Sequence, residues 1–338
     1  MHNKLDLLQR VGDFENLLLA YSACAKGKRG SIGYKKSVFN RGEHLLAISE
    51  KILTHSFKWG GYREFTVKDP KARSVMAASF YNRVVHHAIY RQIDPYLDPL
   101  MSDSVFACRS QRGNRAAVQS LIQALRRIGP DRFAIKLDIS QYFASIPHKL
   151  LIDKVFSSLP DQSLWTLIER LLASHHTEGS PGVGIPIGNY TSQLFANFFL
   201  IELDKLACEK LKFPYYWLES SDLPDHAFYV RYMDDFVLIG KNRTDVFDAA
   251  MAVVNYAKKE LCLNIPFTKR VPLGSDPIPF LGFVAEAKHT RPLARNLRRF
   301  DKKLRRLKKV PLSRPSMIAQ VKASFQAWVN AANLELKG

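Results

Sequence analysis

The sequence predicts an α+β fold in which an antiparallel sheet is combined with many helices. Its most informative segment is 229–240, YVRYMDDFVLIG, where two β-branched and aromatic runs flank Asp234 and Asp235. The blocks around it show helical spacing of apolar residues, without the regular strand and helix alternation of a parallel fold. With 338 residues, 46% of them hydrophobic, the chain suits one large core or two to three compact subdomains.

Apolar periodicity and breaker residues place the elements along the chain. Helices are expected at 3–19, 44–55, 77–93, 147–159, 163–174, 191–211, 244–261, 293–309 and 316–329. Strands are expected at 62–67, 133–137, 263–267 and 279–284, in addition to a hairpin at 228–239. Pro95 and Pro99 are expected to end the helix at 77–93, because proline lacks a backbone N–H. The helix at 293–309 should bury one apolar stripe under a cationic exterior, namely Leu293, Leu297, Phe300, Leu304 and Leu307.

The charge predicts a polyanionic partner. A formal charge of +19 and a pI near 9.8 favour nucleic acid, and residues 291–338 carry 13 Lys and Arg against two acidic residues. No apolar stretch reaches about 18 residues and no signal-peptide pattern opens the chain, so we expect a soluble, cytoplasmic protein without a membrane partner. The four cysteines have no CxxC spacing, which favours reduced and mostly buried thiols over zinc ligands or disulfides.

Three carboxylates are predicted at adjacent strand ends. Asp138 follows the apolar strand 133–137, and Asp234 and Asp235 sit at the tip of the hairpin. Together they would hold two Mg²⁺ ions, with Mn²⁺ as a substitute, about 3.5–4 Å apart for phosphoryl transfer. The plain alternatives are a solvated Asp-Asp turn and a helix-capping Asp138.

Beyond these carboxylates, a series of motifs resembles the reverse transcriptase family, in that family's order. YREFTVKDPKARSV at 62–75 and SDSVFACRSQRGNRAAV at 102–118 resemble its fingers motifs. LDISQYFASI is similar to the motif that bears the first catalytic aspartate, and GVGIPIGNYTSQLFANFFLIELD at 182–204 to the template and dNTP-pocket motif. YMDD resembles the catalytic box, and FLGF at 280–283 the primer grip.

The resemblance implies a right-hand polymerase with fingers, palm and helical thumb. We expect a helical N-terminal extension at 1–60, fingers at 61–132, a palm at 133–284 and a basic helical thumb at 285–338. The palm would include a fingers segment at about 160–185 and an insertion at 212–227, which either docks a partner or is an idle surface loop.

The same resemblance assigns roles around the reacting phosphates. Asp138, Asp234 and Asp235 would be metal ligands, joined by the carbonyl of Ile139. Lys269 would act as a general acid near the leaving pyrophosphate, or be an ordinary surface lysine.

Further residues would bind the nucleotide. Lys71 and Arg73 would reach the triphosphate, although a solvated basic turn is the simpler interpretation. Phe143 would exclude a 2′-hydroxyl by steric clash, or it is simply a core residue. Ile187 and Gln193 would line the dNTP pocket.

The nucleic acid itself would contact the fingers, grip and thumb. Arg109 would support the fingers or template, or form a structural salt bridge. The primer grip and the backbone-tracking thumb cations would be Phe280, Leu281, Gly282, Arg298, Lys302 and Arg305.

The resemblance is strongest to the enzymes of diversity-generating retroelements, for which it implies an RNA template, a cDNA product and a small basic helical accessory protein. Many faithful relatives have Gln at the position of Ile187, and Ile cannot hydrogen-bond the sugar or primer end, so low-fidelity copying is expected. Antiphage defence reverse transcriptases, sometimes acting with a second such enzyme, and a non-catalytic RNA-binding scaffold remain alternatives. Homo-oligomerisation is left open.

Overall fold

A computed structural model describes residues 6–68, 72–220, 223–266, 270–271, 277–287, 290–309 and 315–333. The chain folds as two compact units. Unit 1 comprises residues 1–102, 139–203 and 255–265, and unit 2 comprises residues 103–138, 204–254 and 266–338. Within the described part, helices combine with antiparallel sheets, which confirms the α+β class.

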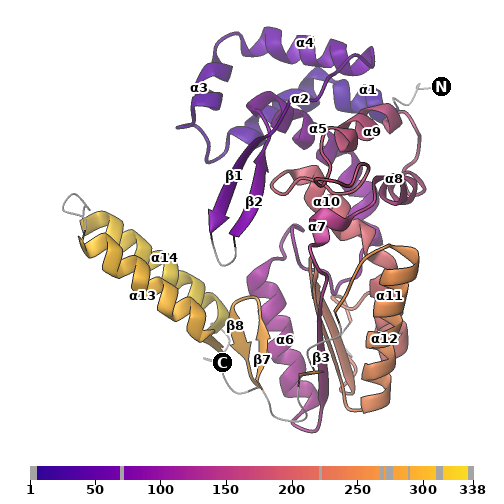
Figure 1. The fold of residues 1–338 in the computed structure, drawn as a ribbon, viewed down its shortest axis with the longest axis vertical. Coiled ribbons are helices and arrows are strands. Elements are labelled where there is room, and N and C mark those ends of the chain that lie inside the picture. The colour runs from indigo at the N-terminus through magenta and orange to yellow at the C-terminus, as the bar shows by residue number, and fades with distance from the viewer. Residues whose placement is uncertain are drawn as a thin grey trace. The chain divides into compact units, whose positions relative to one another are not determined.

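Unit 1 is mainly helical. Three helices, α1 (Leu7–Gly12), α2 (Phe14–Ala25) and α3 (Ile32–Val38), pack on the longer α5 (Phe80–Leu97) (Figure 1). The helix α4 (Arg41–Leu53) packs on α1 and α2. A second group comprises α7 (Tyr142–Ser145), α8 (His148–Phe156), α9 (Trp165–Ala173) and α10 (Tyr190–Phe199). Because α10 packs on both α5 and α8, the two groups share one apolar core. A two-stranded hairpin, β1 (Arg63–Lys68) with β2 (Ala72–Ala77), completes this unit.

The centre of unit 2 is a four-stranded antiparallel sheet. The strand order is β4-β5-β3-β6, formed by β3 (Phe133–Asp138), β4 (Ala227–Tyr232), β5 (Asp235–Gly240) and β6 (Arg270–Val271). The helix α6 (Asn114–Ile128) packs against β4 with seven buried residues on its inner face. Strand β5 is buried from Phe236 to Gly240, as expected for a central strand covered on both faces.

The C-terminal part of unit 2 is a small sheet with two helices. Strands β7 (Ile278–Phe280), β8 (Phe283–Ala285) and β9 (Thr290–Pro292) are antiparallel neighbours in that order. Figure 1 shows α13 (Ala294–Lys309) and α14 (Pro315–Asn333) lying side by side beyond this sheet. The rings of Phe300 and Phe325 stack at 3.8 Å between the two helices.

Two of the boundaries between the units fall within further helices, α11 (Ile201–Leu211) and α12 (Arg243–Glu260). The helix expected at 191–211 is therefore two helices, since regular structure is interrupted at Leu200. Similarly, the helix expected at 3–19 is two, because Asp13 ends α1 and accepts a capping hydrogen bond from the amide of Asn16.

Other sequence expectations were wrong in detail. Pro95 does not end α5, which continues to Leu97 with the proline in its last turn. Residues 263–266 form no strand, and 279–284 is not one strand but the end of β7, a turn at 281–282 and the start of β8. Leu297 is 42% exposed and therefore does not belong to a buried stripe on α13. Two of the four cysteines, Cys108 and Cys262, are exposed, so the thiols are not mostly buried.

Across the described residues, no helix combines the length and apolar character that spanning a membrane requires.

Candidate active site

The sheet of unit 2 brings the predicted carboxylates to one end. Strand β3 ends at Asp138 and β5 begins at Asp235, and the two residues are direct cross-strand partners. Asp234 precedes Asp235 in the tight turn between β4 and β5. Cross-strand partners place their Cβ atoms about 4.5–5.5 Å apart, and like charges there repel. The hairpin and the strand ending at Asp138 are thus as the sequence predicted.

A buried arginine fixes the turn that carries these aspartates. Met233 has a φ of 58°, a left-handed conformation that a residue with a side chain adopts only when its surroundings hold it there. The Arg231 guanidinium donates from Nη1 to the carbonyl oxygen of Met233 at 3.1 Å. Its Nε and Nη2 donate to the two carboxylate oxygens of Asp204 at 2.6 Å each.

The same cluster is closed by a tyrosine. The Tyr229 hydroxyl donates to Asp204 Oδ1 at 2.6 Å, and the side chains of Arg231 and Asp204 are both 0% exposed. Burial, followed by the neighbouring Asp204, raises the pKa of Tyr229 well above its usual value, so the hydroxyl remains a donor. Arg231 was not among the residues expected at the site, although a charged side chain within an apolar strand was a visible indication of it.

Asp235 lies in an electrostatically strained environment. Burial raises its pKa to about 6, the Lys136 ammonium opposes that shift, and the nearby carboxylates of Asp138 and Asp234 add to it. Lys136 Nζ donates to Asp235 Oδ2 at 2.6 Å. The other oxygen, Oδ1, is buried and has no hydrogen-bond partner within the described chain. An unpaired buried carboxylate oxygen is costly unless a cation or water binds it.

The donor chemistry of this strand end fits a hard divalent cation. Carboxylate oxygens are the ligands that Mg²⁺ prefers, and the unpaired Oδ1 of Asp235 offers such an atom. Within the described residues, however, no three acidic, histidine or cysteine side chains are gathered closely enough to hold a metal. Instead, Lys136 supplies the positive charge at Asp235. Ile139 follows Asp138 directly in the chain, and its side chain is buried.

The nucleotide-pocket candidates with described side chains lie in unit 1. Phe143, in α7, is partly buried, and its carbonyl oxygen accepts from the amide of Ile185 at 2.8 Å. Two residues later, the carbonyl oxygen of Ile187 accepts from the amide of Met76 on β2 at 3.2 Å. These two backbone bonds connect the segment that carries Phe143, the loop that carries Ile187, and the β1–β2 hairpin.

The loop after Ile187 contains a residue that the sequence analysis overlooked. Asn189 is 2% exposed, and neither its side-chain oxygen nor its nitrogen has a hydrogen-bond partner in the described chain. It precedes α10, in which Gln193 is partly exposed. Such an amide needs water or a ligand as a partner.

Three further candidates have no described side chain. Lys71 and Lys269 lie outside the described residues. Arg73 belongs to β2, where its backbone is opposite Val67, and nothing is described of its side chain. Their roles remain predictions.

The primer-grip candidates form the tight turn of the β7–β8 hairpin. Phe280 is 1% exposed, and Leu281 and Gly282 make the turn with φ values of 47° and 90°. The Gly282 carbonyl oxygen accepts from the amide of Leu293 and from Asn296 Nδ2, both at 2.9 Å. A side chain on Gly282 would meet Asn296 Nδ2 at 2.7 Å, which explains the glycine.

The predicted thumb cations are exposed on α13. Arg298, Lys302 and Arg305 follow at spacings of four and three, which places them on one face of the helix. This exposure is what contact with a phosphate backbone requires.

Arg109 lies in a loop that the insertion holds in place. Arg109 Nη1 donates to the carbonyl oxygen of Val105 at 3.3 Å, so at least part of its role is structural. In the same loop, Asp103 Oδ2 accepts from the amides of Trp217 and Leu218 at 2.6 and 2.8 Å. Burial tends to raise the pKa of Asp103, but these bonds and Arg112 hold it below its usual value. The described part of 212–227 is therefore a structural support for this loop.

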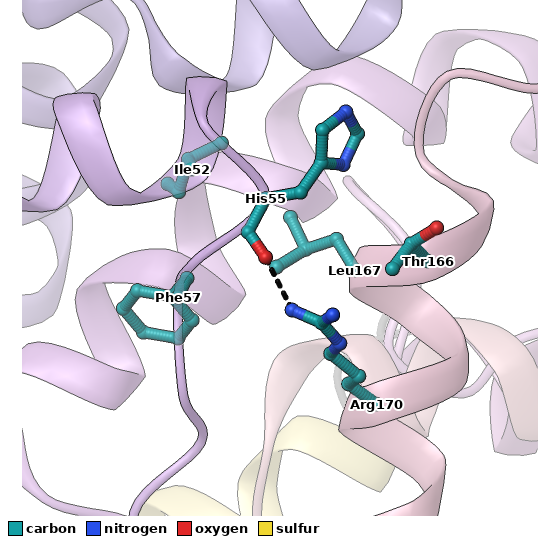
Figure 2. A pocket seen from close by; sticks show the side chains of 6 residues that line it. All are labelled: Ile52, His55, Phe57, Thr166, Leu167 and Arg170. Carbon is teal, nitrogen blue, oxygen red and sulfur yellow. Dashed lines mark hydrogen bonds between the residues drawn. The ribbon is translucent and has the colours of Figure 1, made fainter.

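One small pocket lies elsewhere, between the end of α4 and α9 in unit 1 (Figure 2). Arg170 Nη1 donates to the carbonyl oxygen of His55 across it. Its empty volume is about 170 Å³ and includes open solvent. It is a small gap between packed elements, and none of the candidate site residues lines it.

The chain thus combines an antiparallel sheet, cross-strand carboxylates at one end of that sheet and a strongly basic composition. The model of the family described as "Reverse transcriptase (RNA-dependent DNA polymerase)" matches residues 67–285, which include all three aspartates. The chain belongs to the reverse transcriptase family.

Curated relatives are similar over different lengths. The chain is 23% identical to the COX1/OXI3 intron 2 protein of Saccharomyces cerevisiae, over 83% of this chain and 40% of that protein. It is 25% identical to protein YkfC of Escherichia coli, over 70% of this chain and 71% of YkfC. It is 27% identical to the group II intron-encoded protein LtrA of Lactococcus lactis, over 42% of this chain and 24% of LtrA. The chain therefore spans well under half of two of these relatives.

Solved structures with a similar arrangement include a Cas6-RT-Cas1–Cas2 complex, with a TM-score of 0.43 and 19% identity over 76% of this chain and 43% of that chain. Another is apo telomerase from Candida tropicalis, with a TM-score of 0.49 and 13% identity over 69% of this chain and 55% of that chain.

Proposed function

We propose that this protein is an RNA-directed DNA polymerase that extends a 3′-hydroxyl with dNTPs on an RNA template. The observation that carries the proposal is the register of the central sheet, in which Asp138 faces Asp235 beside the turn that holds Asp234. The family match spans all three residues and supports the same chemistry. The net charge of +19 supports a nucleic acid as the polymer bound.

The three carboxylates would hold two Mg²⁺ ions, with the Ile139 carbonyl as a further ligand. Those ions, when bound, supply charge stabilisation for the attacking and leaving oxygens. The protein's own part is to position: Arg231 fixes the turn by its hydrogen bond to Met233. Lys71 and Arg73 would bind the triphosphate, and Lys269 would donate a proton to the pyrophosphate.

In this proposal, residues 1–60 are a helical extension, 61–132 the fingers, 133–284 the palm and 285–338 the thumb. The exposed Arg298, Lys302 and Arg305 would follow the duplex backbone, while Phe280, Leu281 and Gly282 would hold the primer end. Arg109 would support the template side from its loop.

For the biological role, we propose low-fidelity cDNA synthesis in a diversity-generating retroelement, with a small basic helical accessory protein as partner. Ile187 supports this role. Its backbone is bonded to β2, so its position is fixed, while its side chain offers no hydrogen bond to an incoming nucleotide. Selection of the correct base pair should then be weak.

The decisive experiment uses the purified full chain with the RNA that co-purifies. Supplied with dNTPs and Mg²⁺, the wild type should make DNA complementary to a defined RNA, with errors concentrated at template adenines. Asp234→Asn should make none, and it serves as the blank. Faithful copies, simple repeats or untemplated DNA would replace the retroelement role by a defence role without affecting the polymerase assignment.

A non-catalytic scaffold is the alternative from another class. It predicts RNA binding with no DNA product in the wild type, and an Asp234→Asn variant that behaves identically. Retained RNA binding with loss of synthesis in Asp234→Asn separates catalysis from binding and rules out the scaffold.

Two substitutions test the pocket. Ile187→Gln should lower the error rate several-fold, and an unchanged error rate would remove the support that Ile187 gives to low fidelity. Phe143→Ala should increase incorporation of ribonucleotides by about tenfold or more, because the clash with a 2′-hydroxyl is relieved. Unchanged sugar selection would make Phe143 a core residue.

A further inference from the structure

Lys136 joins the carboxylate end of the sheet to the β7–β8 hairpin. Its Nζ lies 2.6 Å from Asp235 Oδ2 and 3.1 Å from the carbonyl oxygen of Pro279. The same ammonium lies 5.6 Å from the centroid of the Phe280 ring, within the range of a cation–π contact. One side chain therefore contacts a candidate metal ligand and the strand that leads into the candidate primer grip.

The surroundings distinguish this contact from an ordinary surface ion pair. The side chains of Lys136 and Asp235 are only 20% and 22% exposed. By contrast, Lys241 and Asp225, at the opposite end of β5, are 44% and 68% exposed. Water screens the second pair more strongly, so the first is the stronger electrostatic interaction.

The contact also gives the two carboxylate oxygens of Asp235 different surroundings. Lys136 occupies Oδ2, while the buried Oδ1 has no hydrogen-bond partner in the described chain. A carboxylate held in this way has a fixed rotamer and presents one oxygen to a ligand. The positive charge of Lys136 offsets repulsion among the three carboxylates, and it must also oppose any cation that approaches them.

We infer that Lys136 is a positioning residue that supplies a fixed positive charge at Asp235 and couples this carboxylate to the primer-grip hairpin. The inference rests on the proposed function, because only then do Asp235 and the hairpin serve one reaction. Lys136 holds the Asp235 side chain by Oδ2 so that Oδ1 faces the divalent ion. Through Pro279 and Phe280 it holds the hairpin at a fixed distance from that carboxylate.

The test is Lys136→Met, which keeps the length of the side chain and removes its charge. The full chain should bind Mn²⁺ about tenfold more tightly, because a nearby repulsive charge is lost. Electron paramagnetic resonance measures this binding with Mn²⁺ alone, in the absence of nucleic acid. The loss of this repulsion should outweigh any loss of Asp235 positioning, so weaker binding in the neutral variants would contradict the charge role. Lys136→Gln provides a second neutral variant, and Lys136→Arg should retain the wild-type affinity.

Lys241→Met is the matched control, since it removes a lysine from an exposed ion pair at the other end of the same strand. It should leave Mn²⁺ affinity unchanged. Unaltered Mn²⁺ affinity in both neutral Lys136 variants, or no Mn²⁺ binding that depends on Asp235, would overturn the inference.

The hairpin coupling has a separate readout. In single-nucleotide extension, Lys136→Met should lower kcat about tenfold while the KM for dNTP stays within twofold, because the primer end rather than the nucleotide is misplaced. Lys136→Arg should restore most of kcat. A wild type that binds Mn²⁺ through Asp235 but never extends a primer would refute the proposed function, and it would leave the charge role of Lys136 standing.

Discussion

Two ion pairs of equal length in unit 2 differ in their burial and in how completely their polar atoms are hydrogen-bonded. Arg231 and Asp204 meet at 2.6 Å with both side chains fully buried, and Tyr229 and the Met233 carbonyl complete their hydrogen bonds. Lys136 and Asp235 also meet at 2.6 Å, but they are partly exposed, and one oxygen of Asp235 has no hydrogen-bond partner among the residues that the structure describes.

The difference shows that the pair which fixes the backbone of the turn is not the pair which can accept a ligand. The first pair is fully satisfied, so it can fix the backbone of the turn but cannot accept a ligand. The second retains unused binding capacity and a raised pKa, which are features of functional sites. The comparison predicts that substitutions at the first pair change stability and that those at the second change activity.

The largest effect is expected for Asp235→Asn. Polymerase activity should fall by about a thousandfold or more, because a metal-binding charge is lost, while the metal-free protein should be at least as stable as the wild type. Single-nucleotide extension and urea unfolding measure the two quantities. Asp225→Asn, which alters an exposed carboxylate, is the control and should keep full activity. A large loss of stability in Asp235→Asn would contradict the comparison.

Arg231→Met should destabilise the protein by about 3–5 kcal/mol, because Asp204 would remain charged and unpaired in the interior. Combining it with Asp204→Leu should recover much of that loss, since no buried charge then remains. Urea unfolding of the two single variants and the double variant gives the coupling energy. Additive losses would show that the pair is not a unit.

The pH dependence of the metal-free protein should report on Asp235. Its folded-state pKa of about 6 exceeds its usual value, so the folded state binds the proton more tightly than the unfolded chain does. This group therefore stabilises the fold at low pH, and the contribution is lost as the pH rises from about 4 to about 6. The difference in unfolding free energy between wild type and Asp235→Asn should change over that interval. Saturating Mg²⁺ should abolish the trend, and a difference that stays constant with pH would disprove it.

The smallest effect is expected for Lys241→Met, which removes an exposed ion pair. The free energy of unfolding should change little, because solvent screens such pairs. Thermal unfolding measures this, and a loss comparable to that of Arg231→Met would mean that exposure does not separate the two kinds of pair.

Local pattern was enough to predict the carboxylate end of the sheet. The apolar runs on both sides of Asp234–Asp235 and before Asp138 identified three strands, and antiparallel pairing then brought Asp138 opposite Asp235. The interruptions and ends of helices were harder to predict. Nothing local marks Leu200 as an interruption, and Pro95 is tolerated because it lies in the last turn of α5. The helix α6 went unpredicted although its apolar spacing is regular.

The partners of charged residues could not be predicted. Arg231 and Asp204 are 27 residues apart, and Lys136 and Asp235 are 99 apart, so only the folded chain shows which charges meet. The sequence also could not show that Asp103 holds the 212–220 segment, since those amides lie more than 100 residues away.

The turn at Gly282 has a mechanical consequence. Its carbonyl oxygen accepts hydrogen bonds from Leu293 and Asn296 at the start of α13, and Phe283 stacks on Trp328 of α14 at 4.2 Å. The tip of the hairpin is thereby fastened to both C-terminal helices through one peptide group and one ring. Because the turn is hydrogen-bonded to the start of α13 and Phe283 stacks on α14, we expect a displacement of the helix pair to displace the hairpin with it.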